Sequence, residues 1–374
     1  LPESQSVAVR FARVDQLLGV AVAPDQVTRI LSQLGLQPQP QAEGLSVRAP
    51  SFRFDIAIEA DVIEEIGRVY GYDRIPDDQT SGRLAMLSLP ETQKTRFDVY
   101  QAVAARGYQE VVSYAFVDEQ WERDFAANEQ AIRLQNPLAS QMSVMRSTLI
   151  GGLVEILQNN LNRKQARVRV FEVARVFRKD GDGQYLQTER IGGLAYGLSL
   201  PEQWGEPGRL VDFYDVKADV ESLLAGHTVV FQAATHPALH PGRCAEIWVN
   251  GNNVGFMGQL HPQWLQKYDL PHAPIVFELD CAAVWQRQKV RYQAVSKFQP
   301  VRRDLAFVVP EAMSTHTLLT ALRNVAEPLV RDVGLFDVYR GQGLPEHSKS
   351  LAVRVLLQDD GKTLTDAEVD NVMA

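Results

Sequence analysis

The stretch from Ser51 to Pro76 constrains the fold most strongly, because its hydrophobic period changes along its length. In its first part, every second residue is apolar: Phe52, Phe54, Ile56 and Ile58. This alternation predicts a half-buried β-strand. In its second part, apolar residues recur at the three- and four-residue steps of a helix face: Val62, Ile66, Val69 and Tyr70. We therefore expect a strand followed by an amphipathic helix.

Four of the carboxylates in residues 55–65 are candidates for a shared role: Asp55, Asp61, Glu64 and Glu65. Asp61, with Glu64 three residues later, has the pattern of a capping box, and acids in a first turn favour the positive end of a helix. Alternatively, carboxylates that converge repel one another unless a cation lies among them, and ligation by oxygen alone suits Mg²⁺ or Ca²⁺. The spacing by itself favours capping and leaves a metal site open.

Length and charge bound the class of protein. The 374 residues predict two or three domains at about 150 residues each. The formal net charge of −8 argues against a protein dominated by non-specific nucleic-acid binding, although it allows a local basic face. Cys244 and Cys281 do not make a disulfide framework and fit a reducing cytoplasm. No apolar run approaches the roughly 20 residues of a membrane span, so no membrane partner is expected.

The ends of the chain suggest a longer parent. The first residue is Leu1, not Met, and the sequence stops inside a helical pattern at Ala374. We therefore expect a fragment of a longer protein.

Patterning along the chain predicts three α+β units. Residues 1–76 alternate strand, helix (24–37), strand and helix, and a polar, then apolar, linker follows at 77–90. A winged-helix DNA binder of this size is possible, but the unit lacks a helix rich in Lys and Arg.

The middle part of the sequence predicts a strand at 108–116, a long helix at 147–164 and strands at 168–177, 190–199, 245–251 and 253–260, with a helix at 212–226. Residues 291–374 read β-α-β-β-α, a ferredoxin-like unit lacking its last strand and hence truncated at its C-terminus.

Candidate chemical sites are few. His236, His240, Cys244 and His261 have spacings seen in zinc sites, but Pro237, Pro241 and Gly242 interrupt any shared helix face, which favours structural turns. The sequence contains no G-x-S-x-G, P-loop or G-x-G-x-x-G motif. Accordingly, we assign no catalytic residue.

Two basic clusters remain. Arg163, Lys164, Arg167 and Arg169 follow the long helix, where the helix dipole favours cations. In the last unit, cations gather around one aromatic residue, with a further arginine later: Lys297, Phe298, Arg302, Arg303 and Arg340. These residues could stack on and neutralise single-stranded RNA, or form an ordinary charged sheet edge.

Several long motifs together resemble one family. They are SFRFDIAIEADVIEEIGRVYGYDRIP, NPLASQMSVMRSTLIGGLVEILQNNLNRK, VFEVARVF, LHPGRCAEIWVNGNNVGFMGQLHP, SKFQPVRRDLAFVV and LFDVYRGQGLPEHSKSLAVRVLLQD. Collinear and covering nearly the whole chain, they resemble the C-terminal half of the bacterial phenylalanyl-tRNA synthetase β subunit.

The resemblance implies a domain plan. Residues 1–76 correspond to a small module with a Mg²⁺ site, whose ligands fall on Asp55, Asp61, Glu64 and Glu65. Residues 77–290 correspond to a class II synthetase-like, non-catalytic core with an antiparallel sheet. Residues 291–374 correspond to an anticodon-binding, ferredoxin-like domain, which favours RNA binding by the second basic cluster.

The resemblance also implies partners. In the family, an α subunit carries ATP, phenylalanine and the reaction, in an (αβ)₂ tetramer that charges tRNA(Phe). Glu172 supports this division, because a carboxylate stands where a phosphate-binding cation would be wanted. The helix at 147–164, with Gly151-Gly152 and a leucine stripe, is expected to pack at the subunit interface. The competing hypothesis is a stand-alone nucleic-acid-binding regulator with a degenerate synthetase core.

Overall fold

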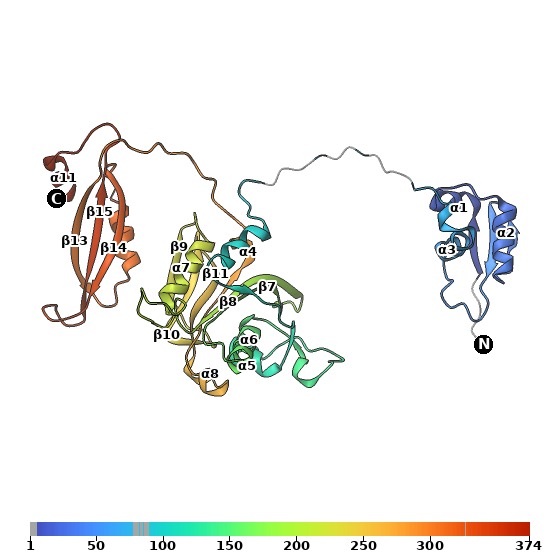
Figure 1. Cartoon of the computed structure of the whole chain (residues 1–374), viewed down its shortest axis with the longest axis horizontal. Helices are drawn as coiled ribbons and strands as arrows, with labels where there is room; N and C mark the ends of the chain where they lie inside the picture. Colours follow the sequence, from blue (N-terminus) through green and yellow to red (C-terminus); the bar gives the residue numbers. More distant parts are fainter. Residues whose placement is uncertain (1–5, 78–81, 83–84, 86–89, 326) are drawn as a thin grey trace. The chain divides into compact units, whose positions relative to one another are not determined.

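The structure is a computed structural model that describes residues 6–77, 82, 85, 90–325 and 327–374 (Figure 1). The predicted linker at 77–90 lies almost entirely outside the described residues, as does Ala326 at the end of a predicted helix. The chain divides into two compact units, Leu1–Ser88 and Leu89–Ala374. Each is described by itself.

The first unit packs three helices and a short 3₁₀ turn on a small antiparallel sheet. Its elements are β1 (Ser6–Arg10), α1 (Phe11–Leu18), α2 (Pro24–Gln33), β2 (Gln39–Gln41), β3 (Gly44–Arg48), α3 (Glu59–Tyr70) and η1 (Tyr72–Arg74). The strand order is β1-β3-β2. The predicted helix from Pro24 is confirmed, with proline in its first turn, where its missing N–H costs nothing. Val27, Leu31, Val62 and Ile66 join one core.

The predicted strand over Phe52–Ile58 is wrong. No strand lies between Arg48 and Glu59, and Phe52, Phe54 and Ile58 are 69%, 89% and 60% exposed. Only Ile56 of the alternating set enters the core. The preceding strand β3 is central and paired on both sides, so the segment that follows it cannot pair with β3, and Pro50 cannot donate to a ladder.

The second unit is built on a seven-stranded sheet in the order β4-β7-β8-β12-β11-β10-β9. The strands are β4 (Gln109–Glu110), β7 (Val168–Lys179), β8 (Tyr185–Tyr196), β9 (Val229–Ala233), β10 (Leu239–Val249), β11 (Asn252–Leu260) and β12 (Ile275–Asp280). All neighbours are antiparallel except β4 and β7. The strands predicted at 245–251 and 253–260 are confirmed as β10 and β11, which form a hairpin, and Asn250 and Gly251 both take the positive φ of its turn.

Helices cover both faces of this sheet (Figure 1). Neighbouring strand residues such as Val170 and Phe171, or Val276 and Phe277, enter different cores. One core includes residues of α4 (Arg96–Ala104), α7 (Phe213–Leu223) and α9 (Cys281–Val284); the other includes residues of α5 (Glu119–Ala126), α6 (Ile150–Asn162) and α8 (Pro262–Lys267). A two-stranded ribbon of β5 (Phe116–Val117) and β6 (Val144–Met145), with η2 (Ser140–Met142), completes this part. The predicted strand at 108–116 shrinks to β4 and the start of β5.

The rest of this unit contains a separate three-stranded sheet in the order β13-β15-β14. Its elements are β13 (Val301–Pro310), α10 (Thr315–Arg323), β14 (Val330–Tyr339), β15 (Ser348–Leu357) and α11 (Asp366–Met373). The predicted β-α-β-β-α order is confirmed. Val369 of α11 packs with Val355 and Leu357 of β15, so the helix covers one face of the sheet.

The main sheet is tightly packed where Gly193 of β8 faces Phe277 of β12. A Cβ added at Gly193 would clash with the phenylalanine ring, whereas one at Gly181, in the β7–β8 turn, meets no atom within 4 Å. We expect Gly193→Ala to destabilise this unit by about 1–3 kcal/mol through overpacking and the control Gly181→Ala to be near neutral. Urea unfolding of the full chain measures the free energy of unfolding of each variant. Hydrogen exchange of the amides in β8 and β12 shows whether the change lies in this sheet. Equal stability of the two variants would contradict this packing.

Candidate functional sites

The acidic stretch of the first unit is organised by arginines. Arg53 forms a fork on Asp55, with its Nη2 2.6 Å from Oδ2 and its Nε 2.9 Å from Oδ1. The Nη1 of Arg53 reaches Oε2 of Glu65 at 3.1 Å, and Arg68 donates to the same oxygen at 2.7 Å. The loop carrying Asp55 is thereby tied to α3.

The other two carboxylates do not join this group. Oδ2 of Asp61 accepts the backbone N–H groups of Ala57 and Ile58, at 2.8 and 2.9 Å. Asp61 is the third residue of α3 and Ile58 is the N-cap, so the predicted capping box of Asp61 with Glu64 is wrong. Asp61 instead takes the second position of a capping box, three residues after the N-cap. The Glu64 side chain is exposed.

The arrangement of these four residues does not fit a Mg²⁺ ion. Carboxylate oxygens are suitable donors, but those of Asp55 and Glu65 are taken by guanidinium groups and that of Asp61 by backbone amides. Among the described residues, no three His, Cys, Asp or Glu side chains are placed where they could hold a metal ion. The magnesium assignment stays a prediction.

The arginines also shift the acid–base behaviour of this cluster. Hydrogen bonds from Arg53 lower the pKa of Asp55 to about 2. Hydrogen bonds from Arg68, and then from Arg53, lower the pKa of Glu65 to about 2. Both groups are therefore ionised throughout the physiological range.

In the core of the second unit, three buried carboxylates hold three consecutive residues. Glu172 pairs with Arg146 at 3.1 Å. Glu122 accepts the Ser147 backbone N–H at 2.7 Å and its hydroxyl at 2.5 Å, and Glu278 accepts the Thr148 hydroxyl at 2.6 Å. All three glutamates are at most 2% exposed.

This network gives Glu172 a structural role that its sequence position did not reveal. Besides Arg146, it accepts the backbone N–H and the hydroxyl of Ser113, at 3.2 and 2.6 Å. Sequence analysis named Glu172 and missed Glu122 and Glu278, which lie 25 and 130 residues from their partners.

The apolar stripe of α6 is buried inside this chain, so it does not support the expected subunit interface, which stays a prediction. Leu149, Leu153 and Leu157 are fully buried, and α6 packs on β7, β8 and α5. A Cβ at Gly151 would lie 2.6 Å from Cε3 of Trp121, and one at Gly152 would clash with Ser113. The glycines therefore allow close approach to this chain's own side chains.

The basic residues after α6 are largely structural. Arg167 donates to the carbonyl oxygens of Leu198 and Ser199, at 3.1 and 3.2 Å. Arg169 pairs with Asp219 at 3.1 Å. Arg163 and Lys164 are exposed.

The three histidines among the candidate zinc residues each serve a local turn. The Nδ1 atoms of His236, His240 and His261 accept the backbone N–H two residues further on, at 3.2, 3.0 and 3.1 Å. Burial raises the pKa of the Cys244 thiol to about 11, so it is not a nucleophile at neutral pH.

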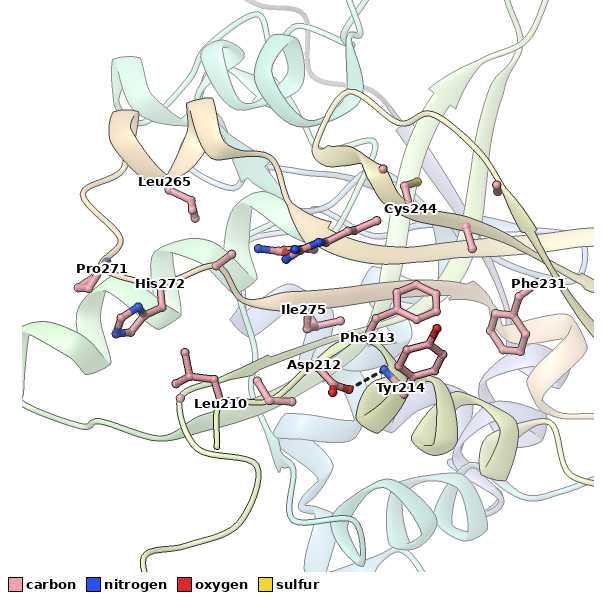
Figure 2. Close-up of a pocket in the computed structure, with 18 residues that line it drawn as sticks. Leu210, Asp212, Phe213, Tyr214, Phe231, Cys244, Leu265, Pro271, His272 and Ile275 are labelled. Atoms are coloured by element: carbon pink, nitrogen blue, oxygen red, sulfur yellow. Dashed lines mark hydrogen bonds between the residues drawn. The ribbon is translucent and has the colours of Figure 1, made fainter. Parts of the chain in front are cut away.

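A cavity of about 930 Å³ lies beside the start of α7 (Figure 2). Phe213, Tyr214 and Phe231 gather toward one end, and Pro271 and His272 lie at the other. Its carboxylate, Asp212, accepts the Tyr214 backbone N–H at 2.8 Å and so caps α7. That interaction accounts for the acid without a catalytic role.

The strand β13 separates two arginines that are neighbours in sequence. Exposure alternates along the strand, and Arg302 lies on the more exposed side. Arg302 pairs with Asp304 at 2.8 Å, and its guanidinium carbon lies 5.2 Å from the centre of the Phe336 ring. Arg303 points toward the helices, where it lies 3.4 Å from Asp366 of α11.

The exposed side of this sheet carries residues that sequence analysis missed. Phe336 and Tyr339 of β14 are 49% and 47% exposed, and Arg354 of β15 is paired with Asp332 at 3.2 Å. Phe336 is the extra residue of a β-bulge, between the pairs that Leu335 and Asp337 form with β15. We call Arg302, Phe336, Tyr339 and Arg354 the open-face residues. The bulge has no signature in the sequence, although the two aromatics, spaced three apart in a predicted strand, were a usable signal.

The remaining predicted RNA-binding residues are spread around this sheet. Arg340 follows β14 and pairs with Glu311 at 2.9 Å. Lys297 is exposed and Phe298 half-buried, ahead of β13.

Among the described residues, no helix is long and apolar enough to cross a membrane.

The arginine contacts predict how the first unit responds to acid. Because the pKa of Glu65 is depressed, its contribution to stability is fully present above its ordinary pKa of 4.5 and is lost as the pH falls through about 2. We expect wild type to lose more protection of α3 amides between pH 5 and 2 than Glu65→Gln, in hydrogen exchange compared at matched pH. Glu64→Gln, at an exposed neighbour, is the control and should follow wild type. Parallel curves for wild type and Glu65→Gln would refute the role of the arginines.

Three family models match this chain, one after another. Residues 7–72 match the tRNA synthetase B5 domain, residues 75–281 the phenylalanyl tRNA synthetase beta chain CLM domain, and residues 296–374 the ferredoxin-fold anticodon binding domain. The last match coincides with the sheet that carries the open-face residues. A solved structure of pyrrolysyl-tRNA synthetase from Desulfitobacterium hafniense covers 50% of this chain and 67% of its own, at 13% identity and a TM-score of 0.38, too weak to carry an argument.

Curated relatives agree with these models. The phenylalanine–tRNA ligase beta subunit of Neisseria meningitidis serogroup B is 66% identical over 370 residues, covering 99% of this chain and 47% of the relative. Those of Chromobacterium violaceum and Nitrosospira multiformis are 55% and 45% identical, each covering 100% of this chain and 47% of the relative. This chain spans about half the length of the relatives it matches, and it belongs to the phenylalanyl-tRNA synthetase beta chain family.

Proposed function

We propose that this chain is a portion of a phenylalanine–tRNA ligase β subunit that helps to bind tRNA(Phe) and to assemble the enzyme. A partner α subunit, in an (αβ)₂ tetramer, binds ATP and phenylalanine and carries the reaction. The names of the relatives and the order of the three matched domains support this proposal.

The observation that carries the proposal is the open face of the three-stranded sheet. Unpaired RNA bases are bound by stacking on exposed aromatic rings, while nearby cations contact phosphates. Phe336 and Tyr339 supply two half-exposed rings, and Arg302 and Arg354 supply cations that are about half exposed. The surface ion pairs of these arginines are weak and can be exchanged for phosphate.

The buried glutamates of the seven-stranded core support the proposal that the α subunit carries the reaction. A bound triphosphate needs cations around it, whereas Glu122, Glu172 and Glu278 are buried in this core and engaged with its own residues. We therefore propose no catalytic residue in this chain.

Cys244 and Cys281 are free and buried, which suits the cytoplasmic location proposed for such an enzyme. A Mg²⁺ ion on Asp55, Asp61, Glu64 and Glu65 belongs to the same proposal, and it requires these residues to rearrange.

Arginine substitutions on the two sides of β13 test the RNA-binding face. We expect Arg302→Ala to weaken tRNA binding and to lower the salt slope of the affinity by about one, whereas Arg303→Ala, the adjacent control, should leave both unchanged. Phe336→Ala should weaken binding about 5- to 150-fold, the range expected for one lost stacking contact. Filter binding at several salt concentrations measures these effects. Equal losses for Arg302→Ala and Arg303→Ala would contradict the assignment of the face.

Reconstitution tests the division of labour. We expect phenylalanine-dependent ATP–pyrophosphate exchange only when the full-length parent of this chain is mixed with its α subunit, and none from this chain alone. Activity of this chain alone would overturn the proposal. So would a failure of the parent to associate with the α subunit in sedimentation.

A further inference from the structure

We propose that Arg53 is a built-in cation of the first unit, which holds the Asp55 and Glu65 carboxylates and excludes a divalent ion until it is displaced. The inference rests on the proposed magnesium-binding function of these residues and adds the group that controls it. Its geometric basis is independent and lies in the contacts of one side chain.

The contacts of Arg53 use the oxygens that a metal would need. Its Nε and Nη2 reach Oδ1 and Oδ2 of Asp55, at 2.9 and 2.6 Å, and its Nη1 reaches Oε2 of Glu65 at 3.1 Å. A Mg²⁺ ion binds oxygen at about 2.0–2.1 Å in a strict octahedron. It cannot bridge the two carboxylates while a guanidinium lies between them, so metal and arginine are alternatives.

Charge around the cluster strengthens this competition. Arg68 donates to the same Glu65 oxygen as Arg53, at 2.7 Å. A divalent ion bridging the two acids would therefore lie within a few ångströms of two guanidinium groups, which repel it. The Arg53 and Glu65 side chains are only 22% and 10% exposed, so solvent screens this repulsion less than at an open surface.

The remaining acids do not compensate. Asp61 holds two backbone N–H groups at the start of α3, where the helix dipole is positive and disfavours a further cation. Metal binding thus requires Arg53 to leave, and a partner that offers Arg53 another acceptor would favour the exchange.

The test is divalent-ion binding by the full 374-residue chain. Mn²⁺ serves as the probe, its free concentration is read by electron paramagnetic resonance, and Mg²⁺ competes. We expect Arg53→Gln to bind Mn²⁺ at least about tenfold more tightly than wild type. Adding Glu65→Gln to Arg53→Gln should remove the gain, which would place the ion at this cluster.

A matched control separates loss of a metal competitor from loss of any ion pair. Arg10 forms a similar fork on Glu59, at 2.7 and 3.1 Å, elsewhere in the same unit. We expect Arg10→Gln to bind Mn²⁺ as wild type does. If Arg53→Gln fails to fold by circular dichroism, Arg53→Lys, which keeps the charge and loses the fork, should show an intermediate gain.

The outcomes distinguish this inference from the magnesium proposal. Equally tight binding by wild type and Arg53→Gln would overturn the role of Arg53 and leave a magnesium site standing. Binding by neither would overturn both. Equal gains in Arg10→Gln and Arg53→Gln would show a general charge effect and would also refute the inference.

Discussion

The packing of α6 in the second unit depends on three buried carboxylates, which hold Arg146, Ser147 and Thr148. Each comes from a different element: Glu122 from α5, Glu172 from β7 and Glu278 from β12. Because these residues precede α6, the network sets where the helix begins and which face it presents to the sheet. Leu149, Leu153 and Leu157 then fill the space above β8. Removing Arg146 alone would leave the Glu172 charge unpaired in the interior, which typically costs about 3–5 kcal/mol.

Arginine–carboxylate pairs recur through the chain, and their burial decides what they do. The Arg146–Glu172 pair is almost fully buried and serves the architecture. The Arg53 cluster is partly buried, and it holds a loop on a helix with groups that another cation could claim. The pairs of Arg302 and Arg354 are exposed and cost little to break, which keeps those cations available to a polyanion.

Local patterns in the sequence predicted the elements whose causes are local. Pro24 starts α2, Asn250 and Gly251 make a tight turn between two predicted strands, and Ser314 and Thr365, residue types that favour N-caps, cap α10 and α11. The alternation from Phe52 to Ile58 misled, because a strand also needs a partner strand, and this segment pairs with none. The site was harder still. The hydrogen bonds of Glu278 with Thr148 and of Arg53 with Glu65 depend on which segments lie together in space. The spacing of residues along the chain does not predict this.

Because side chains alternate along β13, Arg302 and Arg303 lie on opposite sides of the sheet. A change at residue 302 alters what the open face offers to a binding partner and leaves the packing beneath the sheet untouched. A change at residue 303 alters the contact with α11 and is invisible from the open face. Substitutions at two neighbouring arginines therefore change different parts of the molecule, the open face in one case and the contact with α11 in the other. A deletion of one residue within the strand would exchange these two effects, because it turns every following side chain to the opposite face.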